Sequence, residues 1–257
     1  MYSFDRPTAR IMLSVTLVVL WLASDACSPN SDSDVVRSAR QEGSTPVGSE
    51  TSPQTPEPGG TNVRARVVFI GTSLTARYGL DDQSFRFTDL VQAKVDSADL
   101  PFAIANAGVR GDTSAGGLRR MGRFLRAPLD VLVIELGAND GLRGLPIETM
   151  RGNLQAIMDS ARVHHPDVQF VLAGMEAPPN LGADYRSAFG SVFRELAEDN
   201  EAVLIPFLLE GVAGRSELNQ VDGTHPTVEG HRLVSETIWE YLGPVLRAAI
   251  PASETSS

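Results

Sequence analysis

The feature that most constrains the fold is an alternation of short apolar runs and longer segments with helical spacing, repeated from residue 66 to residue 249. Each apolar run is rich in β-branched residues and has the length of one buried strand, and each following segment has the periodicity of an amphipathic helix. The expected strands are Arg66–Ile70, Phe102–Ala105, Val131–Leu136, Val168–Leu172 and Ala202–Ile205. The expected helices are Ser84–Val95, Ser114–Leu125, Pro146–His164, Asp184–Asp199 and Thr227–Ala249.

This order of elements predicts a parallel sheet, because a helix between two strands carries the chain back to the edge where the first strand began. We therefore expect an α/β fold, a three-layer α/β/α sandwich with a five-stranded parallel sheet. In such sheets ligands bind beyond the carboxyl ends of the strands. The residues that directly follow each strand are therefore the first candidates for function.

Composition limits the classes of partner. The chain has 257 residues, a net charge of -10 and a pI near 4.9, which argues against a nucleic-acid partner, since phosphate recognition needs clustered Lys and Arg. The single cysteine leaves no intrachain disulfide, so the core must stabilise the fold. No Cys or His cluster has the spacing of a metal site, and we expect neither metal nor cofactor.

The first residues resemble an export signal. Arg6 and Arg10 precede an apolar stretch from Ile11 to Ala23, which is short for a membrane span but suits the central region of a signal peptide. We expect residues 1–26 to be a signal peptide, cleaved before Cys27, and the protein to reach the periplasm or the cell envelope. Two alternatives stay open: a lipidated Cys27 that tethers the protein to a membrane, or a soluble exported protein. Ser24 stands where a lipoprotein signal usually has leucine.

The rest of the chain divides into three parts. Residues 27–61 are rich in Ser, Pro, Thr and Gly, and from Ser28 to Thr61 they lack Leu, Ile and aromatic residues, which predicts a disordered tether. Residues 62–250 form the expected folded domain, and residues 251–257 form a flexible tail. We expect a monomer. A tether behind a lipid anchor would let the domain stand clear of the membrane surface.

Three expected loops follow strand ends and should share one rim of the sheet: Gly71–Thr75, Gly108–Thr113 and Gly137–Gly141. The first contains the hydroxyl of Ser73, glycines in the second free backbone N–H groups for a ligand, and Asn139 in the third offers an uncharged amide donor.

Far downstream, Asp222 and His225 stand three residues apart in a turn punctuated by glycine and proline. Together with Ser73 they supply an orienting carboxylate, a base and a nucleophile. The ordinary alternatives are that Ser73 caps a helix, that Asn139 is a turn residue and that Pro226 opens a helix. We assign no catalytic role to the other three histidines, which are His164, His165 and His231.

These motifs resemble, in order, the four blocks of the SGNH or GDSL-type hydrolases, and the resemblance runs from about residue 66 to residue 246. The blocks are Gly71-Thr72-Ser73-Leu74, Gly111, Gly137-Ala138-Asn139-Asp140 and Asp222-Gly223-Thr224-His225-Pro226. Within that superfamily, the segments Gly111–Ser114 and Glu135–Gly144 are most similar to the bacterial arylesterase, thioesterase I and lysophospholipase group.

The resemblance implies a flavodoxin-like sheet and a role for each motif residue. Ser73 would be the nucleophile, His225 the general base and Asp222 the residue that orients His225. The oxyanion hole would consist of the backbone N–H groups of Ser73 and Gly111 and the side-chain amide of Asn139. One residue departs from the family pattern, which has Asp where this chain has Thr72. The departure removes a carboxylate that would brace the nucleophile loop, and it leaves the rigidity of that loop open.

The implied function is that of a serine esterase that hydrolyses aryl, short-chain acyl or fatty acyl esters through an acyl-enzyme. Thioesters and lysophospholipids are further candidate substrates. Apolar residues in two rim loops, Leu142, Leu145 and Pro178, are candidates for the substrate-binding wall, although such residues also serve simply to pack loops. Two alternatives remain: a carbohydrate O-acetylesterase on the same fold, and a non-catalytic surface lipoprotein that binds a ligand.

Overall fold

The computed structural model describes residues 64–76, 79 and 85–250, which all belong to one compact unit of the chain, residues 58–257. The proposed signal peptide, residues 1–26, the tether, residues 27–61, and the tail, residues 251–257, lie outside the described residues. The described part is built on a parallel sheet of five strands in the order β2-β1-β3-β4-β5. The strands are β1 (Ala65–Gly71), β2 (Phe102–Gly108), β3 (Val131–Glu135), β4 (Gln169–Ala173) and β5 (Val203–Ile205).

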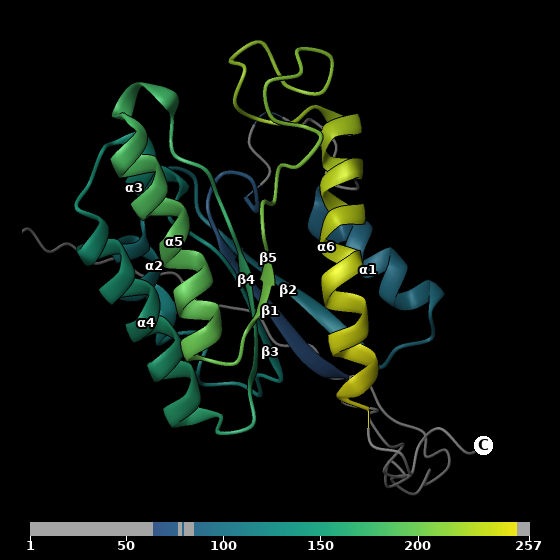
Figure 1. Ribbon diagram of the computed structural model, residues 1–257. Helices are drawn as coiled ribbons and strands as arrows, with labels where there is room; N and C mark the ends of the chain where they lie inside the picture. The colour runs from purple at the N-terminus through teal and green to yellow at the C-terminus, as the bar shows by residue number, and fades with distance from the viewer. Residues whose placement is uncertain (1–63, 77–78, 80–84, 251–257) are drawn as a thin grey trace, which may run out of the picture. The chain divides into compact units, whose positions relative to one another are not determined.

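Helices cover both faces of this sheet. They are α1 (Phe87–Ser97), α2 (Ser114–Met121), α3 (Ala138–Leu142), α4 (Ile147–His164), α5 (Ala183–Asp199) and α6 (Val228–Ala248), with a 3-10 turn at Pro179–Leu181. Figure 1 shows α1 and α6 on one side of the strands and α2, α4 and α5 on the other. This arrangement confirms the expected three-layer α/β/α sandwich with its flavodoxin-like strand order.

Burial on both faces explains why the strands read as continuous apolar runs. Val67, Val68, Phe69 and Ile70 of β1 are all fully buried. On the α1 side Phe69 packs against Phe87, with ring centroids 5.9 Å apart. Each such side chain contributes about 1.5–3 kcal/mol when it leaves water, so the two layers of apolar contacts hold the sheet in place.

Several expected elements differ from the observed ones. The strand expected at Phe102–Ala105 continues to Gly108. The segment Gly137–Gly141, expected as a loop, contains the short helix α3, which begins after Gly137 in a left-handed conformation with φ of 110°. A Cβ on Gly137 would lie 3.0 Å from the ring of Phe193 and 3.1 Å from the sulfur of Met150. The expected helix Ser114–Leu125 ends at Met121, and turns lead from there to β3.

Across residues 64–76, 79 and 85–250, no helix combines the length and the apolar character that a membrane crossing requires.

His231 is a buried histidine of α6, with 1% of its surface exposed. Its ring stacks on Phe87 at 5.9 Å, and its Nδ1 accepts a hydrogen bond of 3.4 Å from the backbone N–H of Phe87. Burial lowers the pKa of His231 from 6.5 to about 4, and the nearby His225 adds to the shift. The neutral imidazole is thus part of the core between α1 and α6.

We predict that His231 makes the fold sensitive to acid. The unfolded chain protonates this imidazole near pH 6.5 and the folded chain only near pH 4. The contribution of neutral His231 to the unfolding free energy is therefore fully present above pH 6.5 and is lost as the pH falls from 6.5 to about 4. The shift corresponds to about 3 kcal/mol. Urea unfolding at pH 6.5 and at pH 4 should show that His231→Gln loses less unfolding free energy than the wild type. Equal losses in both proteins would contradict the assignment.

Candidate active site

The register of the sheet brings the three predicted rim segments together. Gly71 at the end of β1 pairs with Gly108 on one side and with Glu135 on the other, so β1, β2 and β3 end at one level. Ser73 lies in the turn after β1, which is closed by a hydrogen bond of 2.9 Å from the N–H of Ala76 to the carbonyl of Thr72. No helix begins at Ser73, because the next described helix is α1, so the helix-cap alternative does not apply here.

The structure connects Ser73, His225 and Asp222 in a hydrogen-bonded series. The Nε2 of His225 lies 2.8 Å from the Oγ of Ser73, and its Nδ1 lies 2.6 Å from the Oδ2 of Asp222. Ser73 is 9% exposed and sits at the base of a pocket on the rim. An imidazole between a hydroxyl and a carboxylate is the arrangement needed to move the hydroxyl proton to nitrogen.

Asp222 is fixed by its own turn. Its Oδ1 accepts backbone hydrogen bonds of 3.0 Å from both Thr224 and His225. The pKa of Asp222 is lowered to about 2, first by the N–H of His225 and then by that of Thr224. The carboxylate therefore stays ionised near neutral pH, and it holds the ring with Nε2 directed at Ser73.

The turn that carries His225 is held on both sides. The N–H of Gln220 donates to the carbonyl of His225 at 2.7 Å, and the Gln220 side chain donates to the carbonyl of Pro226 at 2.9 Å. Gly223 has φ of 69°, a left-handed conformation that a residue with a side chain rarely adopts. Thr227 then caps α6, with its side chain accepting from the N–H of Gly230 at 3.3 Å, so Pro226 precedes the helix rather than opening it.

Gly111 and Asn139 line the same pocket as Ser73 and His225. Gly111 has φ of 72°, and its carbonyl accepts a hydrogen bond of 2.9 Å from Arg143. The Nδ2 of Asn139 donates to the carbonyl of Asp112 at 2.9 Å, which fixes the amide plane. An amide nitrogen carries two hydrogens, so Asn139 keeps a donor for a ligand in the pocket.

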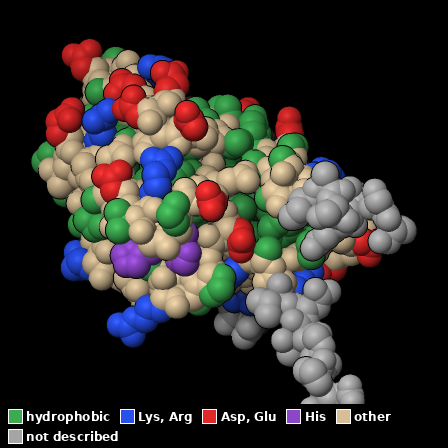
Figure 2. Space-filling model, turned by 90° about the horizontal axis from the view of Figure 1, so that it is seen from below, with side chains coloured by type: hydrophobic (Ala, Val, Ile, Leu, Met, Phe, Trp, Pro, Cys, Tyr) green, Lys and Arg blue, Asp and Glu red, His purple; other side chains and the backbone are tan. Residues whose placement is uncertain are grey.

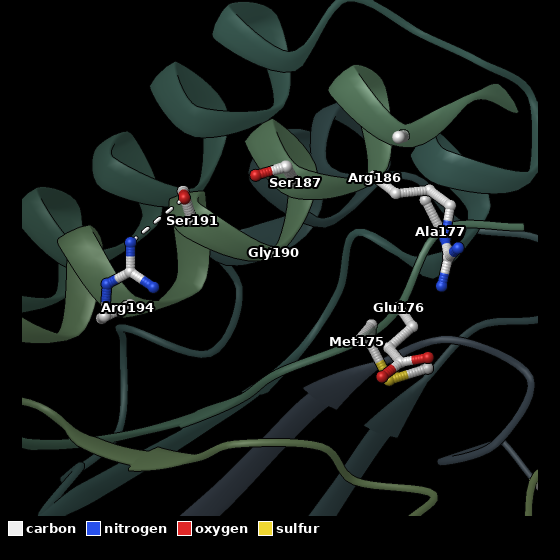
Figure 3. A pocket seen from close by; sticks show the side chains of 9 residues that line it. Met175, Glu176, Ala177, Arg186, Ser187, Gly190, Ser191 and Arg194 are labelled. Atoms are coloured by element: carbon white, nitrogen blue, oxygen red, sulfur yellow. Dashed lines mark hydrogen bonds between the residues drawn. The ribbon is translucent and has the colours of Figure 1, made fainter. Parts of the chain in front are cut away.

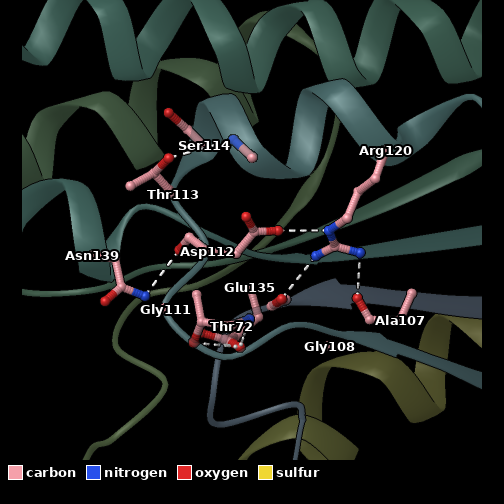
Figure 4. Close-up of polar contacts among 12 residues, drawn as sticks. Thr72, Ala107, Gly108, Gly111, Asp112, Thr113, Ser114, Arg120, Glu135 and Asn139 are labelled. Atoms are coloured by element: carbon pink, nitrogen blue, oxygen red, sulfur yellow. Dashed lines mark hydrogen bonds and ion pairs between the residues drawn. The ribbon is translucent and has the colours of Figure 1, made fainter. Parts of the chain in front are cut away.

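Glu135 is a buried carboxylate that lies against Thr72, the residue before Ser73 (Figure 4). Its Oε2 accepts from the backbone N–H of Thr72 at 2.7 Å, and its Oε1 from the Thr72 hydroxyl at 2.8 Å. Thr75 adds its hydroxyl at 2.8 Å and its N–H at 3.3 Å. Burial raises the pKa of Glu135, and the hydrogen bond from the N–H of Thr72 is the largest of the contacts that oppose this. The turn that carries Ser73 is therefore braced, even though Thr72 stands where the SGNH pattern has Asp.

Arg120 of α2 ties the ends of β1 and β2 to the loop Gly108–Thr113 (Figure 4). Its guanidinium donates to the carbonyls of Gly71 at 2.9 Å and Ala107 at 2.5 Å, and to the carboxylate of Asp112 at 2.6 Å. Since the backbone carbonyl of Asp112 also accepts from Asn139, one largely buried cation sets the spacing between the Ser73 turn and the Asn139 amide. Sequence reasoning assigned no role to Arg120 or Glu135. For Glu135 a signal existed, because it is the only charged residue in the apolar run Val131–Leu136.

The pocket above Ser73 is small and largely apolar, with a volume of about 170 Å³. Its apolar walls are Leu74, Ala138, Leu142, Met175 and Leu209. Of the three predicted wall residues, Leu142 lines the pocket and is 55% exposed, whereas Leu145 and Pro178 are not among its described lining residues. Met175, at the start of the β4–α5 connection, occupies the wall instead.

The other predicted non-catalytic histidines lie far from this rim. His164 and His165 stand at the end of α4, just before β4 begins, and line a depression with Asp130 and Gln169 at the opposite edge of the sheet. Figure 2 looks at the molecule from that side, with histidine side chains in purple. Within the described ranges, no group of three His, Cys, Asp or Glu residues is placed to hold a metal ion.

Comparison with known proteins agrees with this geometry. Residues 69–233 match the model of the GDSL-like Lipase/Acylhydrolase family. The chain belongs to this family. The match begins in β1 and ends in α6, so it includes every segment of the pocket described above.

Similar proteins carry esterase names. Esterase TesA of Pseudomonas aeruginosa is 37% identical over 181 residues, which cover 70% of this chain and 89% of that protein. Thioesterase 1/protease 1/lysophospholipase L1 of Escherichia coli strain K12 is 30% identical over 182 residues, or 70% of this chain and 84% of that protein. Among solved structures, the psychrotrophic esterase EstA of Pseudoalteromonas, inhibited by monoethylphosphonate, has a TM-score of 0.66 at 34% identity, and it covers 71% of this chain and 98% of that chain.

We predict that the hydroxyl of Thr72 contributes to stability through Glu135. Thr72→Val keeps the shape of the side chain but removes the hydrogen bond to Oε1, and it should lower the unfolding free energy by about 1–3 kcal/mol because a buried carboxylate oxygen loses its donor. Thr72→Ser keeps the hydroxyl and is the matched control. Urea unfolding checks both variants, and a valine variant as stable as the serine variant would argue against the brace.

Proposed function

We propose that this protein is a serine esterase that uses Ser73 as nucleophile, His225 as general base and Asp222 to orient the imidazole. The observation that carries the proposal is the unbroken hydrogen-bonded series from Ser73 through His225 to Asp222, across 152 positions of sequence. Membership of an acylhydrolase family and similarity to named esterases support the reaction class. A ligand-binding protein without catalysis would have no use for this alignment.

The proposed mechanism proceeds through an acyl-enzyme. The Nε2 of His225 takes the proton of Ser73 as Oγ attacks the carbonyl carbon of the ester, and the carbonyl oxygen becomes an oxyanion. The tetrahedral intermediate collapses, the bond to the leaving oxygen breaks and His225 returns the proton to the departing alcohol. Water then attacks the acyl-Ser73 ester with the same base, releasing the carboxylic acid and restoring the hydroxyl.

Three donors would stabilise the oxyanion: the backbone N–H groups of Ser73 and Gly111 and the side-chain amide of Asn139. All three residues line the pocket, and the Asn139 amide plane is already fixed by Asp112. Preorganised donors of this kind cost no reorganisation when charge develops, and each is worth about 10²–10³-fold in rate. Arg120 and Glu135 hold the two loops from below and touch no substrate, so they are positioning residues.

The pocket favours an apolar acyl group. Five apolar side chains form its walls, and its volume of about 170 Å³ suits a short acyl chain or an aryl group better than a hydrated sugar ring. Aryl and short-chain acyl esters are thus the proposed substrates, with fatty acyl esters, thioesters and lysophospholipids as extensions through the exposed Leu142 side of the pocket.

The N-terminal sequence supports a proposal about location. In residues 1–26, positive charges, an apolar stretch and small residues follow one another as they do in a signal peptide. We therefore propose that the protein is exported to the periplasm or the cell envelope. Lipidation of Cys27 would add a membrane tether through residues 27–61. The partner is a small-molecule or lipid ester, and the acidic chain, with its net charge of -10, is proposed to act as a monomer without nucleic acid.

We predict that Ser73→Ala abolishes hydrolysis of p-nitrophenyl butyrate, and that Asn139→Ala lowers kcat by about 10²-fold with little change in KM, because the amide acts mainly on the oxyanion. Initial rates measured with purified proteins check both expectations. His164→Ala is the control, since this residue lies at the opposite edge of the sheet. Equal rates for the wild type and Ser73→Ala would refute the proposed function.

A further inference from the structure

A second cavity begins where the active-site pocket ends. Met175, with 6% of its surface exposed, lines both the pocket above Ser73 and a larger hollow of about 570 Å³ beside α5. This α5 groove is bounded by the connection from Met175 to Ala177 and by one face of α5 from Arg186 to Arg194. Figure 3 shows Arg186 on the same side of the groove as Met175 and Arg194 toward the other end.

The α5 groove carries an excess of positive charge in an acidic protein. Two arginines, Arg186 and Arg194, and the hydroxyls of Ser187 and Ser191 line it, against one carboxylate, Glu176. Arg194 donates a hydrogen bond to Ser191 at 3.1 Å. The backbone N–H of Arg186 donates to the carbonyl of Gly182, but its guanidinium forms no ion pair or hydrogen bond with any residue of the described part of the chain. Its guanidinium therefore keeps its donors for an anion.

Spacing along the helix indicates an extended ligand. Arg186 and Arg194 are eight residues apart, which places their Cα atoms about 12 Å apart along α5 at 1.5 Å per residue. Gly190 lies between them, and a Cβ added there would meet nothing within 4 Å. No side chain therefore fills the groove between the two arginines. A compact anion would contact only one arginine, whereas a longer anionic group would reach both.

Exposure suggests which part of an ester would lie there. The acyl group stays covalently attached to Ser73 after the first step and suits the apolar pocket, whereas the leaving group departs before water attacks the acyl-enzyme. The side chains of Arg186, Ser187 and Arg194 are exposed, so a group bound among them can diffuse away. Polar donors and access to solvent thus fit the leaving group.

We propose that the α5 groove binds the phosphate of a phosphate-bearing leaving group, with Arg186 as the direct contact and Arg194 attracting further negative charge. This inference rests on the proposed function, because it assumes that Ser73 attacks the ester at the neighbouring pocket. A guanidinium is well suited to the task, since its donors match phosphate oxygens in geometry and charge. The phosphate can come from two sources, a glycerophosphate headgroup or a nucleotide-bearing thiol.

The test uses pairs of substrates that share one short acyl chain and differ in charge. The first pair is a 1-acylglycerol 3-phosphate and the corresponding 1-acylglycerol, and the second is an acyl-coenzyme A and the acyl-N-acetylcysteamine. The measured quantity is the ratio of kcat/KM for the phosphate member to that for the neutral member. We expect Arg186→Gln to lower this ratio by about tenfold and high salt to lower it in the wild type. A fall in one pair alone identifies the source of the phosphate.

Two further variants extend the test. One should change the kcat/KM ratio in the direction opposite to Arg186→Gln, and the other controls for the loss of one positive charge. Glu176→Gln removes the one carboxylate of the groove and should raise the ratio, because phosphate no longer meets a like charge. Arg126→Gln removes the same charge as Arg186→Gln, but from an exposed position just before β3, at the far edge of the sheet, and should leave the ratio unchanged. Equal effects of the two arginine variants would overturn the specific site.

A steric test is independent of charge. Gly190→Leu fills the open floor of the groove and should lower kcat/KM for the phosphate substrates more than for their neutral partners. Gly152→Leu is the matched control, because it is also an exposed helical glycine with nothing within 4 Å of an added Cβ. If no groove variant changes the ratio while Ser73-dependent hydrolysis of the neutral esters persists, the inference is wrong and the proposed function stands. If Ser73→Ala retains full activity on the neutral esters, the proposed function itself fails.

Discussion

The rim of this protein depends on the register in which β1 pairs with β3. Because Gly71 lies opposite Glu135, the carboxylate of Glu135 reaches the turn that follows β1 and accepts hydrogen bonds from four donor groups of Thr72 and Thr75. Ser73 stands between these two threonines and is presented to the pocket by a turn with little freedom to move. A register shift by one residue would direct Glu135 to the other face of the sheet and release the turn.

The chain departs from the family pattern at Thr72, where the pattern has aspartate, and here the threonine bonds Glu135. Aspartate in place of Thr72 would set a second carboxyl group against the buried Glu135, and one of the two would have to keep its proton. Threonine supplies a hydroxyl donor instead, so the loop is held by a carboxylate from β3 rather than by its own. The turn is therefore held without a carboxylate at position 72, because Glu135 of the neighbouring strand bonds both Thr72 and Thr75.

Apolar runs and turn residues are local signals, so the sequence was enough to predict the three layers and the parallel sheet. The flavodoxin-like strand order and the roles of Ser73, His225 and Asp222 were expected from the resemblance to the SGNH hydrolases. The sequence could not predict the roles of Arg120 and Glu135, which depend on which strands and loops become neighbours. Nor could it distinguish Leu142, which lines the pocket, from Leu145 and Pro178, since the direction of a loop side chain depends on tertiary packing. The short helix α3 was missed because the left-handed turn at Gly137 begins it without a capping side chain.

The most direct test of the account is a crystal structure of the protein after reaction with a small alkyl phosphonate. We expect a covalent bond from phosphorus to the Oγ of Ser73, with the phosphoryl oxygen about 3 Å from the backbone nitrogens of Ser73 and Gly111 and from the Nδ2 of Asn139. His225 should remain hydrogen-bonded to Asp222. An adduct on another residue, or a phosphoryl oxygen that points away from all three nitrogens, would contradict the account.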